Sequence, residues 1–514
     1  MSVLIKYNNK ILTVGGNSLS ISPVDPYNPL GLPYYTVRAQ FSEGYTPSTP
    51  ASGSATQVSS SPNVWDLTYF GWDWSDIFKN NTDLLAVLGA NTHGQYKNVD
   101  DMSSMFDGCT NLTSVALFDT SSVVRMRNMF FNCKKITTIP DFDTTRCWDF
   151  AQMFYHCETL SACPNISTTY RSQSVTLTVN NMFAGCYAIT SVPLLDLNGA
   201  DTTTSMFHGC WSLTTVPLFD LSTVTNASSM FEGCAGLTAI PQFNLSSATN
   251  LNRMFCNCSA LTAVPLIDTR SVLSMKEMFD GCSSLASVAL LNTASVENFQ
   301  SMFYDCTSLA AVPSFDTGSA TNVSYMFSGC SAVSSGTLSL YQQMSSQATP
   351  PSTYENCFRD CGSNTVEGQA ELAQIPRSWG GTQNEYQNTY YLQINAASYN
   401  QIAFCDLHVN GAFQTLTSAQ INDGGWTSIA NTDLAFINNG GKYKEYGDGF
   451  RAYFTSASGD VTNLSYYASK SDSYIASLNC TAILYGKKIG SNTWTEVKRT
   501  TYTQANNKYV SMRI

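Results

Sequence analysis

Apolar residues recur along the middle of the chain with a regular period of twenty-four positions. A Met-Phe pair occurs ten times, and the step from one pair to the next is constant, as from Met206 to Met230, except for one longer step from Met153 to Met182. A cysteine follows each methionine four positions later. The pairs begin at Met105, Met129, Met153, Met182, Met206, Met230, Met254, Met278, Met302 and Met326. A decayed eleventh copy, "CFRDC", places Cys357 and Cys361 at the methionine and cysteine positions. Ten matched copies indicate a repeat architecture.

Each copy contains two kinds of spacing, counted here from its methionine as position zero. Positions seven, ten and thirteen are apolar, as in Leu213, Val216 and Phe219. The apolar residues from position twenty-one through zero to four are three and four apart, which is helical spacing. Those from seven to thirteen have the looser spacing of a short extended segment. We therefore predict a short helix and a short strand in every copy.

Polar residues, glycine and proline mark the ends of these elements. Position three is Gly, Asn or Asp in nine copies and His156 in the tenth, and such residues tolerate the left-handed conformation that ends a helix. Position eleven is proline in seven copies, which ends a strand because proline lacks the N–H of a ladder. Position fourteen is Asp or Asn in eight copies, with Ser167 as a break. We interpret it as a capping or side-chain turn position, with stacked calcium ligands as the alternative.

No single copy can bury its apolar face, but stacked copies make a continuous core. The ten cysteines then point inward, where free thiols pack as small apolar groups. Cross-coil disulfides and a metal site are the alternatives. Zinc is not expected, because Cys256/Cys258 and Cys357/Cys361 have no matching second pair.

The flanking regions have different patterns. Residues 1–64 are rich in Pro, Ser and Gly, and the aromatic stretch 64–78 is expected to cap the open end of the core. After residue 379, short alternating runs such as "TYYLQINA" are separated by Gly- and Asn-rich turns, which predicts an antiparallel β-sandwich. The expected domains are an N-terminal attachment and capping region (1–100), a solenoid of about eleven coils (101–378) and a C-terminal β-sandwich (379–514).

Candidate binding residues lie in the C-terminal region. The sequence places four aromatic residues in its expected loops: Trp426, Tyr443, Tyr446 and Trp494. Aromatic residues at such a tip can stack on the sugar faces of a receptor, but we expect most of the four to lie in the core or at its rim. The outward positions eight and nine of the repeats are Ser, Thr or Ala. They lack the aromatic and Arg anchors that dominate binding hot spots, so the repeats suit a stiff spacer or a broad docking face.

Composition narrows the functional classes. Charged residues make up 12% of the chain and the net charge is −11, which argues against nucleic-acid binding. No apolar run approaches ~18 residues, so membrane insertion is not expected. The opening "MSVLIKYNNKILTVGG" lacks a secretory pattern, and we expect folding in a cytosol. We find none of the metalloprotease, hydrolase or P-loop motifs, and we expect no catalytic residue, cofactor or metal. A carboxylate pair with glycosidase geometry stays open.

The repeat "MFHGCWSLTTVPLFDLSTV" (206–224) resembles the leucine-rich-repeat surface-protein family of the BspA type, which is also found in mycoplasma lipoproteins. The resemblance covers about 100–365 and implies a leucine-rich-repeat solenoid used in adhesion, without catalytic residues. The opening "KYNNKILTVGGNSLSI" and the terminal β-domain also resemble fibre and tail proteins of phages that infect gut Bacteroidetes.

These patterns lead to one functional hypothesis with two alternatives. We expect a non-enzymatic virion fibre or tail-associated protein that mediates attachment to a bacterial host. Its partners would be other virion proteins, through the N-terminal region, and a host surface glycan or protein. A homo-oligomer, with a trimer as one form, is compatible with the sequence. The alternatives are a bacterial cell-surface adhesin, which would place the protein outside the cell, and an enzyme that degrades capsule polysaccharide.

Overall fold

The chain forms two compact units in a computed structural model, Met1–Gly381 and Thr382–Ile514. The described residues are 3–7, 10–15, 18–23, 34–48, 54–58, 61, 63–70, 74–93, 99–167, 175–383, 386–456, 461–470, 478–488, 493–504 and 508–514. The division after Gly381 lies close to the boundary expected at 378/379. No division occurs at residue 100, because the N-terminal region and the repeats share one core.

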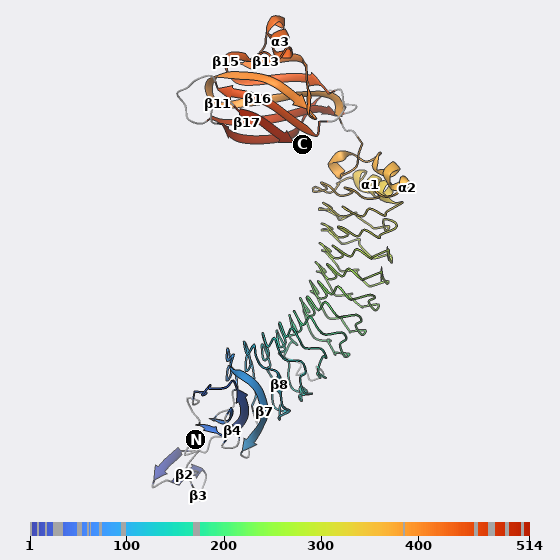
Figure 1. The fold of residues 1–514 in the computed structure, drawn as a ribbon. Helices are drawn as coiled ribbons and strands as arrows, with labels where there is room; N and C mark the ends of the chain where they lie inside the picture. The colour runs from blue at the N-terminus through green and yellow to red at the C-terminus, as the bar shows by residue number, and fades with distance from the viewer. Residues whose placement is uncertain are drawn as a thin grey trace. The chain divides into compact units, whose positions relative to one another are not determined.

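The repeats stack as successive coils, each hydrogen-bonded in parallel to the next (Figure 1). The position four residues before each methionine forms a column of parallel bridges, such as Asn226 to Asn250 and Asn250 to Ser274. Two-residue strands add parallel pairs on another side, where β9 (Ala263–Val264) pairs with β10 (Ser287–Val288). We interpret this coil stack as a solenoid of the leucine-rich-repeat type.

The Met-Phe segment of each coil is a series of tight turns where we expected a short helix. Alternate backbone N–H groups bond within the coil and to the next one. The N–H of Met105 donates to Met102 O at 3.3 Å, whereas the N–H of Phe106 donates to Met129 O in the following coil at 2.9 Å. Among the described residues between 101 and 336, none is helical. In a helix the bonded N–H groups would all have partners inside the same coil, whereas the turns leave alternate N–H groups for bonds between coils.

Two residues per coil adopt the left-handed conformation that makes this alternation possible. The first directly precedes the methionine, as in Ser104 with φ 55°, and the second is at position three, as in Gly108 with φ 75°. The expectation that position three is left-handed is confirmed in all ten copies, including His156 with φ 55°. The left-handed residue before the methionine was not expected, because its identity varies from Ser to Arg and Tyr.

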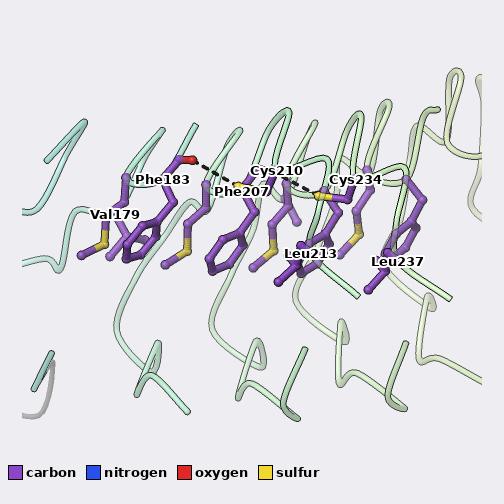
Figure 2. Packing of buried hydrophobic residues seen from close by; sticks show 14 of the residues in the cluster. Val179, Phe183, Phe207, Cys210, Leu213, Cys234 and Leu237 are labelled. Atoms are coloured by element: carbon purple, nitrogen blue, oxygen red, sulfur yellow. Dashed lines mark hydrogen bonds between the residues drawn. The ribbon is translucent and has the colours of Figure 1, made fainter. Parts of the chain in front are cut away.

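The interior of the stack is a ladder of identical side chains (Figure 2). Phe207 and Phe231 stack with ring centroids 5.5 Å apart and planes 5° apart. The Cys234 thiol donates a hydrogen bond to Phe207 O at 3.2 Å, which satisfies a buried carbonyl in the neighbouring coil. Burial raises the pKa of these thiols, to about 12 for Cys210. The ten repeat cysteines are all free and buried, so the buried-thiol prediction is confirmed.

The stack begins one coil earlier than the sequence indicated. The segment 74–81 takes part as a coil, with Ile77-Phe78 in place of Met-Phe. The N–H of Phe78 donates to Met105 O at 2.9 Å, and its ring stacks on Phe106 at 5.6 Å. Asp76 and Asn80 hold the two left-handed positions, with φ 56° and 60°.

An antiparallel sheet covers this first end of the stack. Its strand order is β5-β6-β4-β7-β8, and β7 joins β8 in parallel, through Ala86 and Ser114, so the sheet continues into the repeats. Trp74 is only 2% exposed, and it lies in the same core. The strands of the sheet are β4 (Tyr34–Phe41), β5 (Ser54–Gln57), β6 (Val64–Phe70), β7 (Leu84–His93) and β8 (Ser114–Val115). A separate three-stranded sheet consists of β1 (Val3–Tyr7), β2 (Lys10–Gly15) and β3 (Ser18–Pro23).

Short helices cover the other end of the stack. They are α1 (Thr337–Ser345), α2 (Val366–Leu372) and the 3₁₀ turn η1 (Arg377–Trp379). The N–H of Phe358 donates to Trp379 O at 2.8 Å, so η1 takes the place of a further coil. Met344 and Trp379 close the core. The decayed copy at 357–361 is therefore the last coil of the stack.

The second unit is built around one long strand, β11. Its described strand pairs are all antiparallel, and β11 pairs with β12, β15, β16 and β17. Phe404, Phe450 and Tyr466 belong to its core. Its described strands all join one sheet, and the expected sandwich stays a prediction. The elements of the unit are β11 (Tyr386–Val409), β12 (Ala412–Phe413), β13 (Leu416–Asn422), β14 (Trp426–Ser428), α3 (Asn431–Asn438), β15 (Tyr443–Thr455), β16 (Asn463–Lys470), β17 (Leu478–Lys488), β18 (Trp494–Gln504) and β19 (Lys508–Arg513).

Candidate functional site

The four aromatic candidates from the sequence have different environments. Trp426 begins β14 and Trp494 begins β18, so both are strand residues, and the expectation that they lie in loops is wrong. Tyr443 is only 7% exposed and packs against the Phe450 ring at 5.8 Å. Tyr443 belongs to the core cluster of the unit, together with Phe450. The backbone of Tyr446 belongs to β15, and its side chain lies outside the described part of the chain.

Three tyrosines lie side by side on one face of the sheet in the second unit. Tyr391 on β11 is directly opposite Tyr453 on β15 and Tyr485 on β17. The ring centroids are 5.0 Å apart for the first pair and 4.7 Å for the second. Side chains alternate between the two faces of a strand, and the neighbouring Tyr390 and Leu392 are buried in the core. The tyrosines therefore belong to the opposite face, where Tyr391 is only 6% exposed and its neighbours Tyr453 and Tyr485 are half-buried.

Both tryptophans lie on this same face and extend the row of rings. The Trp494 ring meets Tyr391 edge-on at 4.7 Å and Tyr453 at 5.9 Å. The Arg451 guanidinium lies 3.9 Å from the centre of the Trp426 ring and 5.3 Å from that of Tyr391. Arg451 thus links Trp426 to the tyrosines by cation–π contacts. We call these six residues the aromatic face: Tyr391, Trp426, Arg451, Tyr453, Tyr485 and Trp494.

Hydrogen bonds fix the polar groups of the aromatic face. Arg451 Nε donates to Gln393 Oε1 at 2.7 Å, and the Tyr453 hydroxyl donates to Gln420 Oε1 at 3.0 Å. Burial raises the pKa of Tyr391 to about 12 against the opposing influence of Arg451, so this phenol is neutral at physiological pH. Side chains held by such neighbours lose little freedom when a ligand binds.

The aromatic face combines flat apolar surfaces with nearby donors and acceptors. Aromatic rings attract the slightly positive C–H groups of a ligand through their electron-rich faces. The C–H faces of sugar rings meet this requirement, and their hydroxyls can bond to Gln and Arg side chains. Trp and Tyr also supply large rigid contact areas at low entropic cost. This arrangement suits reversible binding of carbohydrate.

The acidic column at position fourteen of the repeats has a structural role. The carboxylate Oδ1 of Asp220 accepts the backbone N–H of Ser222 at 3.0 Å, and Asn244 does the same for Ser246 at 3.1 Å. The prediction of side-chain turns is therefore confirmed. Among the described residues, no three His, Cys, Asp or Glu side chains form a group that could hold a metal ion. No described helix has both the length and the apolar character that a membrane span requires.

The comparisons with known proteins concern the coil stack alone. A family model described as "Mycoplasma protein of unknown function, DUF285" matches residues 73–194, 201–285 and 235–341, which together are just over half of the chain. The match begins at the first coil, next to Trp74. No curated protein and no solved structure matches the chain. The aromatic face lies outside the matched residues.

Proposed function

The chain belongs to the DUF285 family, whose function is unknown, and from that premise we propose a non-enzymatic attachment protein that binds carbohydrate on a bacterial surface. The observation that carries the proposal is the aromatic face. Its six residues come from β11, β14, β15, β17 and β18 and are in mutual contact. A surface of this composition is typical of binding hot spots, which are enriched in Trp, Tyr and Arg.

The coil stack suits a supporting role in such a protein. Its interior is uniform and closed at both ends, and each coil bonds to its neighbours. Stability in this kind of stack is a sum of neighbour terms, so the number of coils can change without loss of the fold. The stack would then present the binding surface on a stiff support.

Cell binding by the full-length protein tests the proposal. We expect labelled wild-type protein to bind cells of gut Bacteroidetes, the hosts that the sequence resemblance implies. The double variant Trp426→Ala/Trp494→Ala should bind at least about tenfold more weakly, since a hot-spot residue contributes more than ~1.4 kcal/mol. Phe436→Ala is the matched control, because Phe436 on α3 is exposed but is not part of the aromatic face.

Treatment of the cells separates a glycan from a protein receptor. Periodate oxidation cleaves the vicinal diols of sugars, whereas a protease removes surface proteins. Binding that is lost after periodate and retained after protease supports the proposal. Binding that the double variant retains in full would reject the aromatic face as the contact surface.

The setting we propose is a virion fibre or tail, with other virion proteins bound through residues 1–100. A cell-surface adhesin is the alternative. The proposal rests on the organisation of the chain, in which a repeat stack precedes a separate β unit. Mass spectrometry of purified particles and of washed bacterial surfaces distinguishes the two settings. If the protein is detected only on bacterial surfaces, at a level independent of phage, the virion proposal is rejected in favour of the cell-surface adhesin.

One observation favours the enzymatic alternative. Burial, then the nearby Glu277, raises the pKa of Asp280 to about 6, while Glu232 has a pKa of about 2. Carboxyl groups with separated pKa values are typical of acid–base pairs. Neighbouring donors explain the low pKa of Glu232, however: its carboxylate accepts hydrogen bonds from His208 and from Arg253, which also forms an ion pair with it. We therefore keep the non-enzymatic proposal. Release of reducing ends from capsule polysaccharide by wild-type protein, but not by Asp280→Asn, would overturn it.

A further inference from the structure

A run of aromatic side chains follows the surface of the coil stack, apart from the phenylalanine ladder inside. Phe131 stacks on Tyr155 at 4.7 Å, and Tyr187 stacks on Trp211 at 4.3 Å with an interplanar angle of 15°. His156 joins the two pairs: it meets Tyr155 edge-on at 4.6 Å, and its Nδ1 lies 3.4 Å from the Tyr187 hydroxyl. Four consecutive coils contribute to this run.

The run ends at Trp211, which leaves one face of its indole open. The Trp211 side chain is 56% exposed, an unusual fraction for a tryptophan. Tyr187, in the preceding coil, covers one face of the ring. The same repeat position in the following coil is Ala235, whose methyl group is too small to cover the other face.

Two glycines next to Trp211 leave free space beside its indole ring. A Cβ atom added at Gly209 would lie 3.8 Å from Trp211 Nε1, and one added at Gly233 would lie 3.9 Å from it. Both glycines are left-handed, with φ 70° and 74°. Any larger side chain at these positions would stand beside the indole, so glycine leaves the ring accessible from this side.

A set of paired polar groups lies next to Gly233 in the sequence. Glu232 directly precedes Gly233, and its carboxylate accepts a hydrogen bond from Arg253 Nε at 3.1 Å. His208 Nδ1 lies 3.6 Å from the same carboxylate. Burial alone would raise the pKa of Glu232, but hydrogen bonds from His208, Arg253 and Ser229 outweigh it and lower the pKa to about 2. Arg253 also forms an ion pair with Glu277.

We propose that Trp211, Gly233, Ala235 and the Glu232–Arg253 pair form a second carbohydrate site, which we call the coil site. A pyranose ring would stack on the open indole face above Ala235. Its hydroxyls would bond to the Glu232 carboxylate and the Arg253 guanidinium. The coil site belongs to the first compact unit, and the aromatic face belongs to the second. The inference therefore does not depend on the proposed function of the aromatic face.

The surroundings of Trp211 favour a neutral sugar over other ligands. Arg253 is already neutralised by Glu232 and Glu277, so the coil site has no spare positive charge for an anion. A protein partner would need an apolar patch around the anchor. Apart from Tyr187 on the preceding coil, the neighbours on the open side of Trp211 are glycine and alanine, and the charges close by in sequence are paired. The coil site therefore offers a flat ring for stacking and polar side chains that can bond to hydroxyls. A sugar ring can use both.

Fluorine NMR of full-length protein labelled with fluorotryptophan tests the coil site directly. Each of the eight tryptophans gives its own signal, and Trp211→Phe identifies that of Trp211. The probes are soluble oligosaccharides of glucose, mannose, galactose and N-acetylglucosamine. We expect at least one of them to shift the Trp211 signal in a saturable way and to leave that of Trp148 unchanged. The signals of Trp426 and Trp494 report the aromatic face separately in the same titration.

A matched pair of variants tests the open face without removing Trp211. Ala235→Leu should cover the indole and weaken binding at least tenfold. The control Ser283→Leu introduces leucine at the same repeat position two coils further on, and it should have no effect. Equal binding by both variants would overturn the coil site. So would the absence of a Trp211 shift with every sugar, or a shift caused only by a phenylalanine-containing peptide, which would identify a protein contact.

Discussion

The coil stack and the C-terminal unit bury their cores by different means. In the stack, each coil contacts the next coil along the chain, and the same side chains meet again at every repeat. In the C-terminal unit, the single strand β11 pairs with β15, β16 and β17, which are distant in sequence and unlike one another. One environment is repeated in the stack, whereas each environment in the second unit occurs once.

This difference indicates where function can be found in each unit. At most positions of the stack, the residue type is set by the packing that every coil shares. A residue that differs from the other copies at its position is therefore a candidate for a functional role. Trp211 departs in this way, since most other copies have small or charged residues at its position, such as Ala235 and Ser283. The C-terminal unit has no repeat for comparison. There the alternation of strands separates core residues such as Tyr390 from residues of the opposite face such as Tyr391.

The largest effect should follow from a charge in the repeated core. Cys234 is fully buried, and its thiol bonds to the preceding coil. Cys234→Asp places an unpaired carboxylate there and should cost at least about 4 kcal/mol of the free energy of unfolding. Thermal unfolding followed by circular dichroism should show loss of the transition of the stack. The control is Thr238→Asp, which changes an exposed position of the same coil. If the Cys234→Asp protein were as stable as this control, the cysteines would not point into the core.

A smaller effect should distinguish glycines in the two units. Gly281 and Gly424 are both left-handed, with φ 71° and 68°. A Cβ atom at Gly281 would lie 2.4 Å from Asn257 Oδ1 in the neighbouring coil, whereas one at Gly424 meets nothing within 4 Å. Gly424→Ala should therefore cost about 1 kcal/mol for its conformation alone, and Gly281→Ala about 2 kcal/mol because a neighbour must also move. Urea unfolding measures both, and equal costs would mean that neighbouring coils are less closely packed here.

A pH-dependent effect should arise in the stack from Asp280. Burial raises the pKa of Asp280 from 3.8 to about 6, so the folded state binds a proton more tightly than the unfolded state between these values. Stability from this group is present at low pH and is lost as the pH rises through 6. Asp280→Asn should therefore stabilise the stack at pH 7.5 by about 1 kcal/mol, since the half-exposed site screens part of the shift.

Urea unfolding of the wild type and of Asp280→Asn at several pH values checks this effect. The difference between the two proteins should approach zero as the pH falls below 3.8, where Asp280 becomes protonated in the unfolded as well as in the folded state. A difference that does not change with pH would show that Asp280 is not the titrating group.

Sequence alone predicted much of the stack because ten copies report on one environment. The inward Phe and Cys positions and the side-chain turns at position fourteen are examples. The first coil was missed because Ile77 and Asn81 replace the Met and Cys that identify the other copies. The prediction of helices was wrong because the turns have the same apolar spacing as a helix. What distinguishes them is the left-handed residue before each methionine, and this conformation is favoured by bonds between coils, which a local pattern does not show.

The aromatic face was predicted only in part. Trp426 and Trp494 are prominent in the sequence, but Tyr391 and Tyr485 become neighbours only through the register of β11 with β17. That register depends on long-range pairing, which a local pattern does not contain. The alternation within "FRAYFTS" does place Arg451 and Tyr453 on one face, and it was the available indication of this site.

Direct titration of the glycan provides the most decisive measurement of the central proposal. Polysaccharide released from the cells that wild-type protein binds would be titrated into the full-length protein by calorimetry. We predict saturable binding that Trp426→Ala/Trp494→Ala weakens at least about tenfold, with Phe436→Ala unchanged. Undiminished affinity in the double variant would contradict the assignment of carbohydrate binding to the aromatic face.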